Sequence, residues 1–210
     1  MINYEQTPSD FYDQQIESKN FLGAWFHKSR NMQTKALVDE FYAESKIIVD
    51  LGCGNSLWNE SKSPAIGIDV NSDSLNYTMK SGRLNKIIVA PADKTSLPSD
   101  SADIVIITEV LEHLDNLSAQ LNEIKRILKP GAKVICSVPY DTNFSFWRPL
   151  FAIQCFYKGS IQKQEYYKQR CGHINNFSPK SIQDLFISHG FKITKFINHY
   201  FFTIFIIASK

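Results

Sequence analysis

Several features that mark specialised classes of protein are missing from this 210-residue sequence. Its four cysteines form no C-x-x-C pair and have no zinc-site spacing, so we expect reduced thiols rather than a disulfide framework. The longest apolar stretch, residues 200–208, is too short to span a bilayer, and the first residues, MINYEQ, lack the charged start and apolar core of a signal peptide. These absences predict a cytoplasmic protein without a transmembrane segment.

Charge of one sign is not concentrated anywhere either. The 23 basic and 21 acidic residues are interspersed without a run of five or six like charges, which argues against nucleic acid as a partner. No stretch rich in glycine, serine or proline divides the chain, so we expect one domain over residues 1–210.

Four segments can be distinguished within this domain. Residues 1–44 carry apolar groups at helical spacing, with Ser9 and Asp10 at the predicted N-cap. Residues 46–139 alternate strands with helices, residues 140–177 are irregular and aromatic, and residues 178–210 contain a helix to His189 and then two strands, most simply an antiparallel pair. In the second segment we predict strands at 46–51, 65–70, 87–90, 102–107 and 133–138, and helices at 71–81 and 110–128. This alternation predicts an α/β fold with a mostly parallel sheet.

The first predicted strand ends in a glycine turn, DLGCG, at residues 50–54. Open parallel sheets bind ligands at the carboxyl ends of their strands, and Gly52 and Gly54 let the backbone approach such a ligand closely. A dinucleotide fingerprint needs a third glycine where this chain has Leu57, so a nucleoside ligand without a diphosphate fits better, and a dehydrogenase is disfavoured. Asp69, at the end of the second strand, is placed to accept hydrogen bonds from two ribose hydroxyls.

Six short motifs then follow one another along the chain. They are residues 49–54 (VDLGCG), 67–69 (GID), 92–93 with 97–98 (AD and LP), 102–105 (ADIV), 109–113 (EVLEH) and 128–131 (LKPG). With these motifs in order, the chain resembles the class I S-adenosylmethionine-dependent methyltransferases, closely over residues 46–139 and more loosely to its end. The resemblance implies a Rossmann-like α/β fold with a seven-stranded, mostly parallel sheet of order 3-2-1-4-5-7-6, its last strand antiparallel, and helices on both faces.

The resemblance also implies S-adenosyl-L-methionine as the cofactor. Carried over to this sequence, the methionine part is lined by the glycine turn, the ribose is bound by Asp69, and the adenine lies against Val70 and near Ala92 and Asp93, with the Asp93 carboxylate accepting from its amine. The full set of implied cofactor contacts is Asp50, Gly52, Cys53, Gly54, Asp69, Val70, Ala92, Asp93 and Glu109.

Candidates for catalysis come just after the fourth predicted strand. Methyl transfer is an in-line displacement, so the enzyme must align the nucleophile and, for a hydroxyl, help to remove its proton. Glu109, Glu112 and His113 have the spacing of one face at a helix start, and His173 follows in the aromatic segment. Either histidine can serve as a general base near neutral pH, with Glu112 as the third catalytic candidate.

The same side chains offer a second interpretation, a metal site. Glu109, Glu112, His113 and His173 together supply oxygen and nitrogen ligands suited to Mg²⁺ or Mn²⁺, and a metal there lowers the pKa of a coordinated hydroxyl. This set resembles the metal-binding set of small-RNA terminal 2′-O-methyltransferases and of ubiquinone-pathway O-methyltransferases. We favour the simpler interpretation without a metal, in which the acid caps the helix and the histidine lines the pocket.

The aromatic segment from Phe144 to Tyr167 bears on the acceptor. In the family that the chain resembles, the insert after the fifth strand commonly forms the acceptor site, which implies a small, partly apolar or aromatic acceptor. A cap packed on the N-terminal helices and a membrane-contact surface are the other interpretations. We therefore expect O-methylation of a small molecule; the alternatives are a metal-dependent ribose 2′-O-methyltransferase acting on RNA and a non-catalytic nucleoside-binding module.

Overall fold

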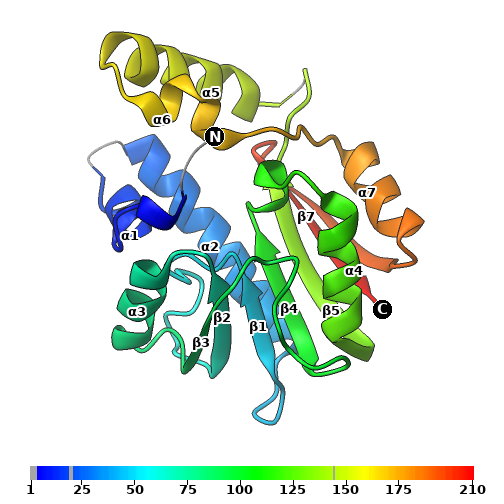
Figure 1. Ribbon diagram of the computed structural model, residues 1–210. Coiled ribbons are helices and arrows are strands. Elements are labelled where there is room, and N and C mark those ends of the chain that lie inside the picture. The colour runs from blue at the N-terminus through cyan, green and yellow to red at the C-terminus, as the bar shows by residue number, and fades with distance from the viewer. Residues whose placement is uncertain (1–3, 19–20, 144) are drawn as a thin grey trace.

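We describe residues 4–18, 21–143 and 145–210 of a computed structural model of the protein (Figure 1). Its centre is a seven-stranded sheet of order β3-β2-β1-β4-β5-β7-β6, in which β7 is antiparallel to both of its neighbours and the other pairs are parallel. The strands are β1 (Ile48–Leu51), β2 (Ala65–Asp69), β3 (Lys86–Val89), β4 (Ala102–Thr108), β5 (Leu128–Pro139), β6 (Lys192–His199) and β7 (Thr203–Ser209). The predicted fold class, strand order and antiparallel last strand are confirmed.

Helices cover both faces of this sheet (Figure 1). They are η1 (Tyr4–Gln6), α1 (Phe11–Ile16), α2 (Phe21–Phe41), α3 (Ser72–Lys80), η2 (Leu111–His113), α4 (Leu117–Ile127), α5 (Trp147–Cys155), the π-helical η3 (Phe156–Ile161), α6 (Glu165–Lys168), η4 (Arg170–Gly172) and α7 (Pro179–Ser188). One core joins the sheet to α4 and α7, and a second joins it to α2 and α3. Among the described residues, no helix is both long enough and apolar enough to cross a bilayer.

The register of the sheet sets where a ligand can bind. Asp50 of β1 pairs with Gly67 of β2 on one side and with Ile106 of β4 on the other, so these three strands end at the same edge. Their β-branched residues are buried on both faces of the sheet, which is typical of parallel strands covered by helices. The glycine turn, Asp69 and the segment after β4 therefore meet at one carboxyl edge.

The helix predicted over residues 110–128 is wrong in its first third. Residues 111–113 form the short 3₁₀ turn η2, Leu114 is extended, and α4 begins only at Leu117. The cause is Asn116, whose side chain accepts a hydrogen bond from the Ala119 amide and caps the new helix. Leu128 already belongs to β5.

This break also changes the position of the first catalytic candidate. Glu109 precedes η2 and has a φ of +55°, a left-handed conformation outside any helix. Glu109, Glu112 and His113 therefore do not share one face of a helix start, contrary to the expectation from their spacing.

The two terminal parts of the chain agree with the sequence to different degrees. The helix predicted to run to His189 is α7, which Ser178 caps, whereas Asp10 stands at the N-cap of α1 without a capping hydrogen bond from its side chain. Residues 140–177, which we call the insert, were expected to be irregular but contain α5, η3, α6 and η4. Phe144, with which the aromatic segment begins, lies outside the described residues.

Candidate active site

The glycine turn after β1 is held to β2 by backbone hydrogen bonds. The amides of Gly52 and Cys53 both donate to the Ile68 carbonyl, at 2.8 and 3.2 Å. Gly52 and Gly54 have φ values of +62° and +46°, where a side chain is strained. A Cβ on Gly52 would lie 2.6 Å from a methyl carbon of Val110, and one on Gly54 would lie 2.7 Å from the Tyr12 ring. Both positions therefore require glycine.

Asp50 lies beneath this turn and is almost fully buried. Its Oδ2 accepts hydrogen bonds from Ser56 Oγ and Trp58 Nε1, each at 2.8 Å. Burial raises the pKa of Asp50 to about 6, despite the two hydrogen bonds that favour the carboxylate. The residue expected to contact the methionine part therefore also holds the turn in place from within the protein.

Replacing Asp50 by asparagine is expected to stabilise the protein at neutral pH. The carboxyl titrates near 3.8 when unfolded and near 6 when folded, so the folded state binds the proton more tightly. The free energy of unfolding should fall by about 3 kcal/mol as the pH rises across this window, and the loss persists above it. An asparagine oxygen still accepts from Ser56 and Trp58 but carries no charge.

Urea unfolding of both proteins at about pH 4 and about pH 8 checks this expectation. The stability gain of Asp50→Asn over wild type should be larger at the higher pH by roughly 2.5 kcal/mol, slightly less than the full effect because the unfolded carboxyl is already partly ionised at pH 4. Equal differences at the two pH values would show that burial does not perturb the Asp50 carboxyl.

Asp69 connects the turn to the end of β2. Its Oδ2 accepts from the Gly54 amide and its Oδ1 from the Asn71 amide, both at 2.9 Å, and burial raises its pKa. Each carboxylate oxygen has a second lone pair, so the group retains capacity for two hydroxyl donors. Close to the edge, Val70 and Asp93 are exposed, and the Ala92 carbonyl accepts from Gln120 Nε2 at 2.9 Å.

These observations fit the cofactor that the resemblance implies. The turn has two positions where a Cβ would clash with Val110 and Tyr12, so its backbone conformation is fixed, and beside it stands an acid with spare acceptor capacity. This is the donor and acceptor pattern that a ribose and its attached chain require.

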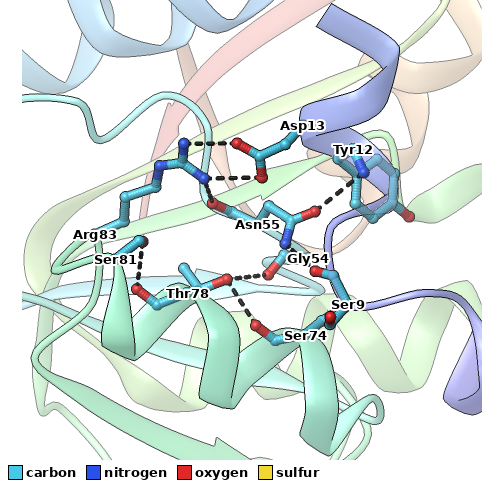
Figure 2. A network of polar contacts seen from close by, with 9 residues as sticks. All are labelled: Ser9, Tyr12, Asp13, Gly54, Asn55, Ser74, Thr78, Ser81 and Arg83. Atoms are coloured by element: carbon cyan, nitrogen blue, oxygen red, sulfur yellow. Dashed lines mark hydrogen bonds and ion pairs between the residues drawn. The ribbon is translucent and has the colours of Figure 1, made fainter. Parts of the chain in front are cut away.

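An N-terminal segment, residues 4–16, lies across the same edge, and we call it the N-terminal strap. Figure 2 shows its contacts: the Tyr12 amide donates to Asn55 Oδ1, Asn55 Nδ2 donates to the Ser9 carbonyl, and Arg83 reaches both oxygens of Asp13, at 2.7 and 3.0 Å. The strap is therefore bonded to the loop that follows Gly54 and, through Arg83, to the chain between α3 and β3.

A second part of the strap contacts other elements of the edge. Asn71 Nδ2 donates to the carbonyls of Tyr4 and Thr7, and the Tyr4 hydroxyl donates to the Cys171 carbonyl. The sequence pattern did not indicate these residues, because their partners are remote in the chain.

Three of the four predicted catalytic and metal candidates come together above this edge. One ligand atom from each of Glu112, His113 and His173 lies within 4.8 Å of the others. Glu112 Oε1 is 3.8 Å from His113 Nε2. We call these residues the Glu-His-His cluster.

The hydrogen bonds of His113 determine which of its nitrogens is available. Nδ1 is 3.2 Å from the Gly172 carbonyl and 2.9 Å from the Tyr4 hydroxyl, whose own proton goes to the Cys171 carbonyl. A carbonyl can only accept, so we assign the ring proton to Nδ1. Nε2 therefore presents a lone pair toward the Glu112 carboxyl.

His173 is held by aromatic side chains of the insert. Its ring stacks on Phe151 of α5 at 5.0 Å and on Trp147 at 6.1 Å, and meets His113 edge-on at 4.9 Å. Burial lowers the pKa of His173 to about 3, with smaller contributions from His113 and Arg170, and burial also lowers the pKa of His113. Both rings are therefore neutral at physiological pH.

Glu112 is the buried acid of the cluster. Burial raises its pKa well above its usual range, and the nearby charge of Glu109 adds to the effect. Its Oε2 has no hydrogen-bond partner among the described residues, while its backbone carbonyl accepts from the amides of Ile174 and Asn175. The insert thus returns directly onto η2 and places His173 beside the acid.

Glu109 stands apart from the cluster. Its Oε2 is 3.0 Å from Arg30 Nη1 of α2, and its Oε1 accepts from Ser137 Oγ at 2.8 Å. Arg30 is thus paired within the protein.

A pocket of about 290 Å³ borders the cluster, and its walls include Tyr4, His113, Gln169, Gly172, His173 and Ile174. The strap, η2 and the insert all contribute to it, so one small molecule could touch both histidines there.

Sheet order, a glycine turn after β1 and an acid at the end of β2 are features of the class I S-adenosylmethionine-dependent methyltransferase fold. The chain belongs to the methyltransferase domain family, whose model matches residues 26–195. An S-adenosylmethionine-dependent methyltransferase from Methanosarcina mazei, 21% identical, superposes with a TM-score of 0.60 over 83% of this chain and 96% of its own. A Thermotoga maritima methyltransferase described as a possible histamine N-methyltransferase, 18% identical, gives 0.64 over 95% and 99%. At these identities the structures support the fold alone.

Two curated relatives have more specific names. The ubiquinone biosynthesis O-methyltransferase of Hydrogenovibrio crunogenus is 25% identical over 161 residues, which cover 72% of this chain and 65% of that protein. The demethylmenaquinone methyltransferase of Staphylococcus epidermidis is 27% identical over 164 residues, or 68% and 66%. The match with this chain spans slightly less than two thirds of each relative's length.

Proposed function

We propose that the protein transfers a methyl group from S-adenosylmethionine to a hydroxyl of a small, partly apolar molecule. The observation that carries the proposal is the Glu-His-His cluster, which borders a pocket and includes a histidine lone pair. The pocket wall places Tyr4 and Ile174 beside the two histidine rings, and these side chains favour an apolar or aromatic acceptor. The names of the two relatives, which refer to ubiquinone and a menaquinone, support a small acceptor of this kind.

The cofactor, when bound, supplies a methyl group on a sulfonium, and its C–S bond breaks as the C–O bond forms, which leaves a neutral thioether. Asp69 is proposed to hold the ribose hydroxyls, with the backbone of the glycine turn beside them. His113 Nε2 takes the proton of the acceptor hydroxyl, which makes the oxygen nucleophilic. The Glu112 carboxyl, 3.8 Å away, faces the imidazolium that forms.

A divalent cation is the competing role for the same three side chains. Glu112 supplies a carboxylate oxygen and the two histidines supply ring nitrogens, a set that Mn²⁺ accepts. Glu109 is already paired with Arg30 and Ser137, so the metal version rests on three protein ligands rather than four. We therefore propose a cluster that acts without a metal, and the experiment below tests whether it binds a cation instead.

The test combines calorimetry with transfer of labelled methyl groups. The protein is loaded with S-adenosylhomocysteine and titrated with Mn²⁺, and the loaded wild type is compared with Glu112→Ala and His173→Ala. In parallel, label transfer is measured to phenols and catechols, and to short RNA, with and without a chelator. We expect loading, no stoichiometric Mn²⁺ binding, and label in the phenolic pool that the chelator does not reduce.

Each other result contradicts a different part of the proposal. Failure to bind S-adenosylhomocysteine contradicts the methyltransferase assignment as a whole. If Mn²⁺ binds stoichiometrically and either variant abolishes this binding, the Glu-His-His cluster is a cation site. Label in RNA replaces the small acceptor by a ribose, and binding without label transfer to any acceptor indicates a nucleoside-binding module.

Loosening the strap is expected to weaken cofactor binding. Asp13 and Arg83 form a largely buried two-point ion pair, which holds the strap beside Gly54. Asp13→Asn and Arg83→Gln should each raise the Kd for S-adenosylhomocysteine by roughly tenfold, mainly through faster dissociation.

Stopped-flow dissociation rates check this expectation against a matched pair on α7. Lys180 and Asp184 form an exposed ion pair, and Asp184→Asn should leave the rate unchanged. If Asp13→Asn releases the ligand no faster than Asp184→Asn, the strap does not cover the bound cofactor.

A further inference from the structure

Helix α5 and the π-helical η3 that continues it carry apolar side chains on two sides. Trp147 and Phe151 face inward and stack on each other and on His173. Leu150, Ile153 and Tyr157 are exposed and recur at spacings of three and four, so they share one face that points away from the protein. An amphipathic helix normally buries its one apolar face, but α5 has a second apolar face that is in contact with solvent.

Neighbouring elements extend this exposed face. Phe146, just before α5, meets Phe201 at 6.1 Å, and its amide donates to the Phe201 carbonyl. Tyr200, in the same turn between β6 and β7, meets Trp25 of α2 at 5.3 Å. The exposed apolar residues of these elements are Phe21, Leu22, Trp25, Met32, Phe146, Leu150, Ile153, Phe156, Tyr157, Ile161, Tyr200 and Phe201, and we call them the apolar face.

The exposed fractions of these side chains are larger than is usual for isolated apolar residues on a protein surface. Single exposed apolar residues are common, but here Phe21 is 77% exposed, Phe156 is 65% exposed and Ile153 is 64% exposed. Groups of exposed aromatic and aliphatic residues of this kind mark interaction surfaces.

The charge around this face indicates what covers it. Residues 140–177 contain five basic and two acidic residues, a net charge of +3 in a chain whose total is +2. The cations are Arg148, Lys158, Lys163, Lys168 and Arg170, and Lys28 lies beside Phe21 and Trp25 on α2. Two of them have acidic partners: Arg148 lies 3.6 Å from the largely buried carboxyl of Asp141, and Lys168 forms an exposed pair with Glu165 that is weak in water.

We propose that the apolar face docks on the surface of an anionic lipid bilayer. Aromatic and aliphatic side chains among lysines and arginines are the composition that interfacial helices use: the apolar groups enter the headgroup boundary and the cations meet anionic lipid. A second copy of the chain fits less well, because a two-fold interface through this face brings two inserts of charge +3 together.

The docked orientation places the acceptor pocket near the bilayer. Helix α5 holds His173 with its inner side while its outer side contacts lipid, so an apolar acceptor dissolved in the membrane lies one helix away from the cluster. Figure 1 shows α5 and α6 above the carboxyl edge of the sheet. This last consequence rests on the proposed function, whereas the docking itself does not.

Vesicle flotation with the full chain tests the docking without any methyl transfer, so its failure is distinguishable from failure of the proposed function. Vesicles of phosphatidylcholine alone are compared with vesicles of equal parts phosphatidylcholine and phosphatidylglycerol. We expect the protein to float with the anionic vesicles, and the bound fraction to fall as salt is added. The double variant Ile153→Glu with Phe156→Glu should lower the partition coefficient at least tenfold, since two apolar groups no longer enter the lipid.

Matched variants separate docking from folding. Ile187→Glu changes a similarly exposed apolar residue on α7 and should bind as wild type does. The milder pair Lys163→Gln and Arg170→Gln keeps the apolar face and should weaken binding only to anionic vesicles, by roughly fivefold for each charge removed. The proposal is overturned if wild type does not bind anionic vesicles, or if the double variant Ile153→Glu with Phe156→Glu binds them equally well. It is also overturned if wild type forms a dimer in solution that this double variant abolishes.

Discussion

Replacing His113 by alanine is expected to lower kcat by about 10²- to 10⁴-fold while the affinity for S-adenosylhomocysteine stays nearly unchanged. The physical reason is the tautomer: Nδ1 is held by the Gly172 carbonyl, so Nε2 is the atom with a lone pair beside Glu112. Alanine removes that lone pair, and water then has to take the acceptor's proton. Initial rates of label transfer, measured over a range of acceptor concentrations, separate kcat from KM.

The pH dependence gives an independent readout of the same role. Burial lowers the pKa of His113, so wild-type kcat/KM should fall only below the ordinary histidine value of about 6.5, as the base becomes protonated. The residual activity of His113→Ala should lack that acid limb. A phenol with a lower pKa should be less affected by the substitution, because it needs less help to lose its proton.

Two variants serve as controls for this result. Tyr4→Phe removes the hydroxyl beside Nδ1 but leaves the Gly172 carbonyl, and should cost only a few-fold in kcat. His189→Gln changes a histidine at the end of α7, bonded to Ser118 and remote from the cluster, and should have no effect. If His113→Ala keeps more than about a tenth of the wild-type kcat, a different group takes the proton.

The sheet could be predicted from the sequence because its signals are local. Short β-branched runs that end in turns identify buried strands, and the acid after the second strand follows from its place beside the glycine turn. Asp69 and Gly54 are indeed hydrogen-bonded, across fifteen residues of sequence. Strand order, by contrast, came from the family resemblance rather than from the periodicity of the residues.

The helix break before α4 shows where periodicity misleads. Leucines at 111, 114, 117 and 121 keep helical spacing through the break, so the pattern indicated one helix. A single side-chain bond, from Asn116 to the Ala119 amide, starts a new helix instead. Asparagine is a favoured N-cap, so Asn116 indicates a helix that starts after Glu109, Glu112 and His113 rather than one that includes them.

The strap could not have been found from the sequence at all. Asn71 bonds to Tyr4 across 67 residues, and Arg83 bonds to Asp13 across 70. No periodic or motif signal links positions so far apart, since their proximity is set by how the whole chain packs. For the same reason the pairing of Arg30 with Glu109, which removes Glu109 from the cluster, was not anticipated.

Replacing Asp69 by alanine is expected to weaken S-adenosylhomocysteine binding by about a hundredfold or more, because hydrogen bonds to a carboxylate contribute about 1.5–3 kcal/mol each and two are lost. Part of the loss also comes from the turn, since the Gly54 and Asn71 amides lose their acceptor. Asp93→Ala, at an exposed site on the same edge, should cost much less. Calorimetric titration of both variants measures the difference.

A 2′-deoxy analogue of S-adenosylhomocysteine separates the two contributions to that loss. Wild type should bind the analogue more weakly than the parent compound, because one hydroxyl no longer donates to the carboxylate. Asp69→Ala should bind both compounds equally, since the partner of that hydroxyl is already gone, and the double-mutant cycle then gives the coupling directly. If the variant discriminates between the two ligands as strongly as wild type does, the carboxylate supports the glycine turn and another group holds the ribose.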